Sequence, residues 1–174
     1  MTSNTSPRPG TIGLVQIHGN MGTLIEYGQW LCGAGFKPWE HSFVLLDDNT
    51  VIMAEPSGAK IVPLSYYAHT PIYWCHALRN EITDAQAEKV VAAGRKYKGV
   101  EYSFIDYELI FQTRVLHLPA GPLKSRLIST KEMICSQLCV QTYTDAGEVL
   151  FPKWYPGQVT PLDIYDLDAK LENK

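Results

Sequence analysis

The sequence lacks the features that mark membrane, secreted and nucleic-acid-binding proteins. None of its 174 residues lies in a run of about 20 apolar residues, the length that a helix needs to cross a bilayer. The first ten residues contain no apolar core of a secretion signal. Lys and Arg number 15 against 18 Asp and Glu, a formal net charge of −3. Because nucleic-acid backbones are bound by cationic surfaces, we expect no nucleic-acid partner.

These absences leave an ordinary globular chain. Hydrophobic residues make up 45% and charged residues 19% of the sequence, and the length is that of one domain. We expect a disordered N-terminal arm at 1–10, one domain over 11–167 and a C-terminal tail at 168–174. We also expect no transmembrane segment. The predicted location is the cytoplasm, or outside the cell after release by a signal-independent route such as a phage particle or lysis.

Cysteine is also scarce, with four in the chain: Cys32, Cys75, Cys135 and Cys139. Four are too few for a disulfide scaffold in a chain of this length. The spacing of Cys135 and Cys139 is not completed to a zinc quartet by a second pair, since His69 and His76 lie seven positions apart. We therefore expect no metal and no cofactor.

Strand-like and helix-like patterns divide the chain into two halves. Strand patterns occupy 11–17, 41–46, 51–55, 60–64 and 72–78, while helical patterns occupy 21–31, 83–98, 104–116, 134–146 and a short stretch from Pro161. Residues 119–128 form a polar connector. Thr83 and Gln86 form a capping box, and Thr160 precedes Pro161 as an N-cap. This order predicts an α+β fold with helices packed on an antiparallel sheet.

Cys135 is the candidate nucleophile. It falls in the first turn of the helix predicted at 134–146, where free N–H groups and the helix dipole stabilise a thiolate. We therefore expect a lowered pKa for this thiol. The same N–H groups can bind an oxyanion. Cys139, one turn further along among apolar neighbours, has the pattern of a core thiol, as do Cys32 and Cys75.

His41 is the candidate base among five histidines, the others being His18, His69, His76 and His117. It begins a strand directly after a loop, a common position for catalytic groups. If 47–49 form a three-residue turn, Leu46 pairs with Thr50 and Glu55 falls opposite His41, on the same face of the hairpin. Glu55 is then the candidate that orients the imidazole.

Four stretches in this order resemble the circularly permuted branch of the NlpC-like papain-fold cysteine peptidases, which includes the YiiX-like proteins and is related to the lecithin:retinol acyltransferase family. They read Trp-Glu-His-Ser-Phe-Val at 39–44, Ala-Glu-Pro at 54–56, Ile-Cys-Ser-Gln-Leu at 134–138 and Pro-Gly-Gln-Val-Thr-Pro-Leu-Asp-Ile-Tyr at 156–165. The last is similar to the closing signature of that family. The resemblance spans most of the chain and implies a papain-like catalytic domain with the nucleophile at a helix N-terminus.

Carried over residue by residue, the resemblance implies Cys135 as nucleophile, His41 as base and Glu55 as the group that orients it. Residues 99–103 resemble a Gly-x-Pro-Tyr segment, which implies that Tyr102 lines the site and assists the oxyanion. NlpC-like cell-wall peptidases usually read Asp-Cys-Ser-Gly around the nucleophile. Here Ser136 is retained for substrate contact, while Ile134 replaces the Asp and Gln137 the Gly.

The resemblance therefore implies a cysteine hydrolase that cleaves an amide bond through a thioester, with cell-wall peptides as the expected substrate. Two alternatives remain. One is a lipid-directed acyltransferase or thioesterase, whose apolar channel would be lined by aromatic residues: Trp30, Trp39, Trp74, Tyr66 and Tyr67. The other is a catalytically inactive binding module on the same scaffold. The expected partner is a peptide or acyl substrate.

Overall fold

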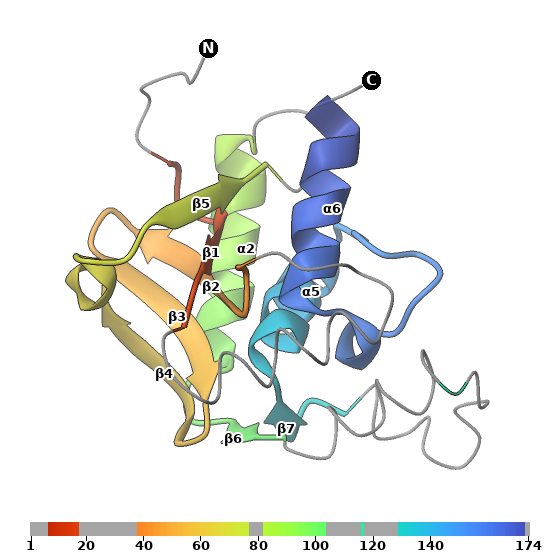
Figure 1. Ribbon diagram of the computed structural model, residues 1–174, viewed down its shortest axis with the longest axis horizontal. Helices are drawn as coiled ribbons and strands as arrows, with labels where there is room; N and C mark the ends of the chain where they lie inside the picture. The colour runs from red at the N-terminus through yellow and green to blue at the C-terminus, as the bar shows by residue number, and fades with distance from the viewer. Residues whose placement is uncertain (1–6, 18–37, 77–81, 104–115, 117–128, 173–174) are drawn as a thin grey trace.

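Figure 1 shows the computed structural model, which describes residues 7–17, 38–76, 82–103, 116 and 129–172. Five strands form an antiparallel sheet in the order β4-β3-β2-β1-β5. They are β1 (Ile12–Val15), β2 (His41–Asp47), β3 (Thr50–Glu55), β4 (Gly58–Pro63) and β5 (Ile72–Cys75). A short parallel pair joins β6 (Glu101–Tyr102) to β7 (Glu132–Met133). The predicted antiparallel sheet is confirmed.

The described part of the chain contains three α-helices, α2 (Asp84–Lys96), α5 (Cys135–Asp145) and α6 (Pro161–Glu172). Short 3-10 turns are η1 (Leu64–Tyr67) and η4 (Pro156–Gln158). The helices gather on one side of the sheet (Figure 1), where α2 and α5 contact β2. The α+β class is therefore confirmed.

The two faces of the sheet are buried by different elements. We call the side that packs against the helices the helix face; it carries Ile12, Leu14, Val44 and Ile52, which form one core with side chains such as Leu138 of α5. We call the other side the outer face. Its buried side chains are Val15, Phe43, Leu45, Val51 and Met53, covered by Tyr67 of η1. Because side chains alternate along a strand, this division fixes the face of each residue of β2.

The β2–β3 hairpin has the predicted upstream register but a different turn. Asp47, not Leu46, pairs with Thr50, and the register shifts between Leu45 and Asp47. The Asp47 carboxylate accepts the N–H of Asn49 at 3.0 Å and the Thr50 hydroxyl at 2.6 Å, which closes a two-residue turn. The predicted three-residue turn is therefore wrong. The β-bulge absorbs the extra residue, so Phe43 still faces Met53.

The helix boundaries follow the capping signals. The Thr83 side chain accepts the N–H of Gln86 and the Gln86 side chain accepts the N–H of Thr83, a confirmed capping box. Gly99 follows with a φ of 88°. At the start of α6, the Asp163 carboxylate accepts the N–H of Thr160 and the Thr160 hydroxyl accepts the N–H of Asp163, so the predicted N-cap Thr160 takes part in a second capping box. This helix has 12 residues and is longer than the short helix predicted.

Both ends of the described chain pack on the domain. The sequence predicts an arm at 1–10, of which 7–10 are described; here the Gly10 N–H donates to the Leu45 carbonyl at 2.6 Å, and the Tyr143 hydroxyl donates to the Gly10 carbonyl at 2.8 Å. It also predicts a tail at 168–174, of which 168–172 are described; these residues continue α6, and Asp168 is buried and accepts the Tyr73 hydroxyl at 2.6 Å.

Several sequence-based predictions fall outside the described residues. They are the helix at 21–31, all but Leu116 of the helix at 104–116, the connector at 119–128 and residues 77–78 of the last strand. Within the described residues, no helix combines the length and the apolar character needed to cross a membrane.

Candidate active site

Cys135 is the first residue of α5, as the sequence pattern predicts. Ile134 before it is extended, with φ −85° and ψ 167°, because the chain arrives from β7 through Met133. The Cys135 side chain is 1% exposed. Its place at the helix start leaves N–H groups of the first turn without partners inside the helix.

The protonation balance at this thiol is opposite to the one expected from the helix start alone. Burial raises the pKa of the Cys135 thiol, and nearby N–H groups of Ser42, Ser136 and Cys135 itself, with the Ser42 hydroxyl, lower it only in part. Desolvation penalises the charged form of a thiol more than these donors favour it. The resting state is therefore a neutral thiol surrounded by donors that favour a thiolate.

The β2 residue next to this thiol is Ser42. It lies on the helix face, opposite Leu14 of β1, and is fully buried. Its N–H and hydroxyl both act on Cys135, and its hydroxyl also lowers the pKa of Cys139, which burial raises strongly. Sequence reasoning missed this residue. The available signal was a serine placed between His41 and the apolar run 43–46 of β2.

His41, also of β2, lies on the outer face. It pairs with Val15, and its ring centroid lies 6.3 Å from that of Tyr67. The side chain is 5% exposed, and Nε2 is buried without a hydrogen-bond partner among the described residues. Burial lowers the pKa of His41 to about 4, while the charge of Glu55 raises it and that of Lys60 lowers it further. The imidazole is therefore neutral at pH 7.

Glu55 lies on the same face as His41. The register of Phe43 with Met53, extended by two residues, places Glu55 opposite His41. Its carboxylate pairs with the Lys60 ammonium at 2.6 Å and accepts the Tyr66 hydroxyl at 3.2 Å. The structure thus brings His41 and Glu55 to one face and Cys135 to Ser42. Nε2 of His41 makes no hydrogen bond to the thiol here.

The two residues expected to contact substrate have different surroundings. The Ser136 hydroxyl is fully buried and donates to the Val159 carbonyl at 2.6 Å, which ties α5 to the end of η4. Its backbone N–H is one of the donors that lower the pKa of the Cys135 thiol. Tyr102 is half-buried and pairs with Met133, two residues before the nucleophile.

Three other candidates that the structure describes take no part in this arrangement. Cys75 is buried and donates to the Ile164 carbonyl at 3.5 Å, and His69 and His76 are exposed. Cys32, His18, His117 and Trp30 lie outside the described residues. Within the ranges that the structure covers, no group of three His, Cys, Asp or Glu side chains is arranged to hold a metal ion.

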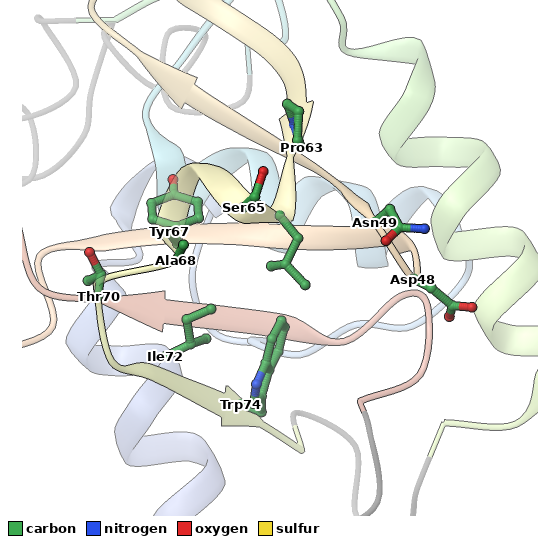
Figure 2. A pocket seen from close by; sticks show the side chains of 10 residues that line it. Asp48, Asn49, Pro63, Ser65, Tyr67, Ala68, Thr70, Ile72 and Trp74 are labelled. Atoms are coloured by element: carbon green, nitrogen blue, oxygen red, sulfur yellow. The ribbon is translucent and has the colours of Figure 1, made fainter.

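A separate groove lies on the outer face, away from Cys135. Figure 2 shows its lining, which includes Tyr67, Ile72 and Trp74 beside the turn residue Asn49. Its volume is about 620 Å³. Of the four described aromatic residues considered for an apolar channel, Trp74 and Tyr67 line the groove and the Tyr66 ring lies 5.2 Å from that of Tyr67. Trp39 packs elsewhere, on Tyr73 and Tyr165.

Comparisons with known proteins add no family to this geometry. Neither the search of protein-family models nor the search of curated proteins returned a match to the chain.

Proposed function

We propose that this protein is a cysteine hydrolase that cleaves amide bonds, with cell-wall peptides as its substrate class, on a circularly permuted NlpC-like papain fold. The carrying observation is the environment of Cys135, a buried thiol at a helix start with three backbone N–H groups around its sulfur. An antiparallel sheet packed against the helix that bears the nucleophile is compatible with this fold. The sequence motifs supply the rest of the argument.

In the proposed reaction, His41 Nε2 takes the proton from the Cys135 thiol and the sulfur attacks the carbonyl carbon of the amide. The N–H groups of Cys135 and Ser136, with the Tyr102 hydroxyl, stabilise the oxyanion that forms. The imidazolium then gives its proton to the leaving nitrogen, and the C–N bond breaks to leave a thioester. Water, deprotonated by His41, hydrolyses this thioester and restores the thiol.

The electrostatics set a condition on this mechanism. A neutral thiol and a neutral imidazole are the resting forms, since burial raises the pKa of Cys135 and lowers that of His41. The proton therefore moves only when Nε2 reaches the sulfur, and Nε2 is unpaired in this structure. Glu55 supports the step because its charge favours the imidazolium.

The three thiols that the structure describes, Cys75, Cys135 and Cys139, are all free. A nucleophilic thiol must stay reduced to react. The location that goes with this proposal is the cytoplasm, or outside the cell after release by a signal-independent route.

The test is a screen of cell-wall peptides beside acyl esters and thioesters, with mass spectrometry of the intact protein. We expect amide cleavage and a transient acyl adduct on Cys135. Cys135→Ala should abolish both, while Cys139→Ala, the matched buried thiol one turn along α5, should keep the adduct. Turnover of acyl esters with no amide cleavage would support the acyltransferase or thioesterase instead. Full activity of Cys135→Ala would overturn the proposal.

A further inference from the structure

The Ser42 hydroxyl is buried and has no hydrogen-bond partner of standard geometry within the described residues. Buried hydroxyls are nearly always paired, because an unmade hydrogen bond costs desolvation energy without return. An unpaired hydroxyl on the central strand of a core therefore calls for a physical reason. Among the described residues, no acceptor is placed to supply one.

The surroundings of Ser42 point to its acceptor. Ser42 lies on the helix face against α5, and both sulfurs of that helix, Cys135 and Cys139, are influenced by its hydroxyl. The paired register between β2 and β3 begins at Phe43 and Met53, so Ser42 precedes the paired part of the strand on that side. Its backbone N–H is one of the donors that lower the pKa of the Cys135 thiol.

We propose that Ser42 is a positioning residue of the nucleophile, holding its N–H and its hydroxyl in place to donate to the Cys135 thiolate. A neutral thiol is a weak acceptor, whereas a thiolate is a strong one. The hydroxyl therefore remains unpaired while the thiol is neutral and becomes paired when the charge forms. Donors fixed in advance at a developing charge cost no reorganisation during the reaction.

The proton balance of this step is simple. The Sγ proton of Cys135 moves to Nε2 of His41, and Ser42 keeps its own proton and donates it only in a hydrogen bond. No bond of Ser42 breaks. This inference rests on the proposed function for its role in catalysis, but the hydrogen bond to the thiolate can be measured without any substrate.

The experiment follows alkylation of Cys135 by iodoacetamide across pH, with the Cys135 peptide quantified by mass spectrometry. Ser42→Ala should raise the pH midpoint by about one unit and slow the reaction about tenfold below it, as expected when a hydrogen bond to a charged group is lost. Ser42→Thr keeps the hydroxyl and should restore the rate to within about threefold. A profile of folded Ser42→Ala that coincides with wild type would overturn the inference.

Thr142→Val is the matched control. Thr142 is a second fully buried hydroxyl without a partner of standard geometry among the described residues, and it lies further along α5. Its removal should leave the midpoint unchanged; an equal shift would mean that the effect is only structural. If Ser42→Ala does not fold, Ser42→Cys provides a side chain of similar size and weaker donor strength, and its midpoint should lie above that of wild type.

The two proposals fail in different ways. If Ser42→Ala shifts the midpoint but no amide is cleaved by the wild type, the proposed function fails and the role of Ser42 stands. If amides are cleaved through Cys135 and Ser42→Ala shifts nothing, only the inference about Ser42 fails.

Discussion

His41 and Ser42 are consecutive residues of β2 whose side chains lie on opposite faces of the sheet. The imidazole of His41 lies beside Tyr67 on the outer face, and Ser42 lies against Cys135 on the helix face. The candidate base is thus one residue along the strand from the residue whose N–H and hydroxyl lower the pKa of the thiol. The proposed reaction requires the ring to reach the sulfur around the end of the strand, because His41 is the first residue of β2.

The burial of His41 predicts acid sensitivity of the fold. Its folded pKa of about 4 lies below the ordinary histidine value of 6.5, so the unfolded chain binds more protons between these values. Stability should therefore be fully present above pH 6.5 and fall as the pH drops toward 4, by up to about 3 kcal/mol. Urea unfolding of wild type and His41→Gln from pH 7.5 to 4 measures this. The variant should show a flatter dependence; parallel curves would contradict the assignment.

Glu55 and Lys60 should tune His41 in opposite directions. The Glu55 charge raises the pKa of His41 and the Lys60 charge lowers it. Glu55→Gln should therefore move the imidazole pKa further down, and Lys60→Gln should move it up. The measurement is an NMR titration of the His41 ring proton in both variants, each of which is the control for the other. A change of the His41 pKa in the same direction in both variants would exclude a charge effect.

In the proposed reaction Glu55 orients the imidazole, whereas His41 transfers the proton, and variants of the two residues should differ accordingly. Glu55→Gln should keep measurable activity, with the acidic limb of the kcat/KM profile moved to lower pH, while His41→Ala should lose nearly all activity. The reason is that Glu55 stabilises the imidazolium but carries no proton itself. Glu55→Gln that is folded and as inactive as Cys135→Ala would contradict these roles.

The order of thiol reactivity is a further expected outcome. Cys135 should be alkylated faster than Cys139 or Cys75, by at least about tenfold, because three N–H groups stabilise its thiolate. Its rate should climb with pH up to at least 8.5, since burial raises the pKa of this thiol. Peptide mapping after partial labelling gives the order directly. Cys139 labelled first would move the nucleophile one turn along α5.

Local patterns predicted much of this structure, and packing decided the rest. Two-residue periodicity placed His41 and Glu55 on one face, although the turn differs, because the Asp47 carboxylate closes a tighter loop and the bulge restores the register. The helix start at Cys135 follows from its flanking pattern. The sign of its pKa shift does not, because the desolvation of a thiol depends on how deeply α5 packs against the sheet.

The proximity of Ser42 to Cys135 also depends on tertiary packing and could not be predicted from the local sequence. Alternation along β2 places Ser42 on the face opposite His41, but it does not say which helix covers that face or at what height. The two residues are 93 positions apart in the sequence and meet only through the contact of β2 with α5. Such a contact has no local signature beyond the polar residue itself.

The Ser136→Ala variant tests whether the Ser136 hydroxyl has a structural role or binds substrate. This hydroxyl donates to the Val159 carbonyl at 2.6 Å inside the core, so Ser136→Ala leaves a buried acceptor unpaired and should lower the free energy of unfolding by about 1–3 kcal/mol. Its backbone N–H remains, so the alkylation midpoint of Cys135 should not move, and KM for any substrate found should stay within about twofold. Urea unfolding, alkylation and steady-state kinetics on the same preparation test this together. A KM that rises tenfold with stability unchanged would assign the hydroxyl to substrate binding, as the sequence resemblance implies, and would require the Ser136 side chain to leave Val159 when substrate binds.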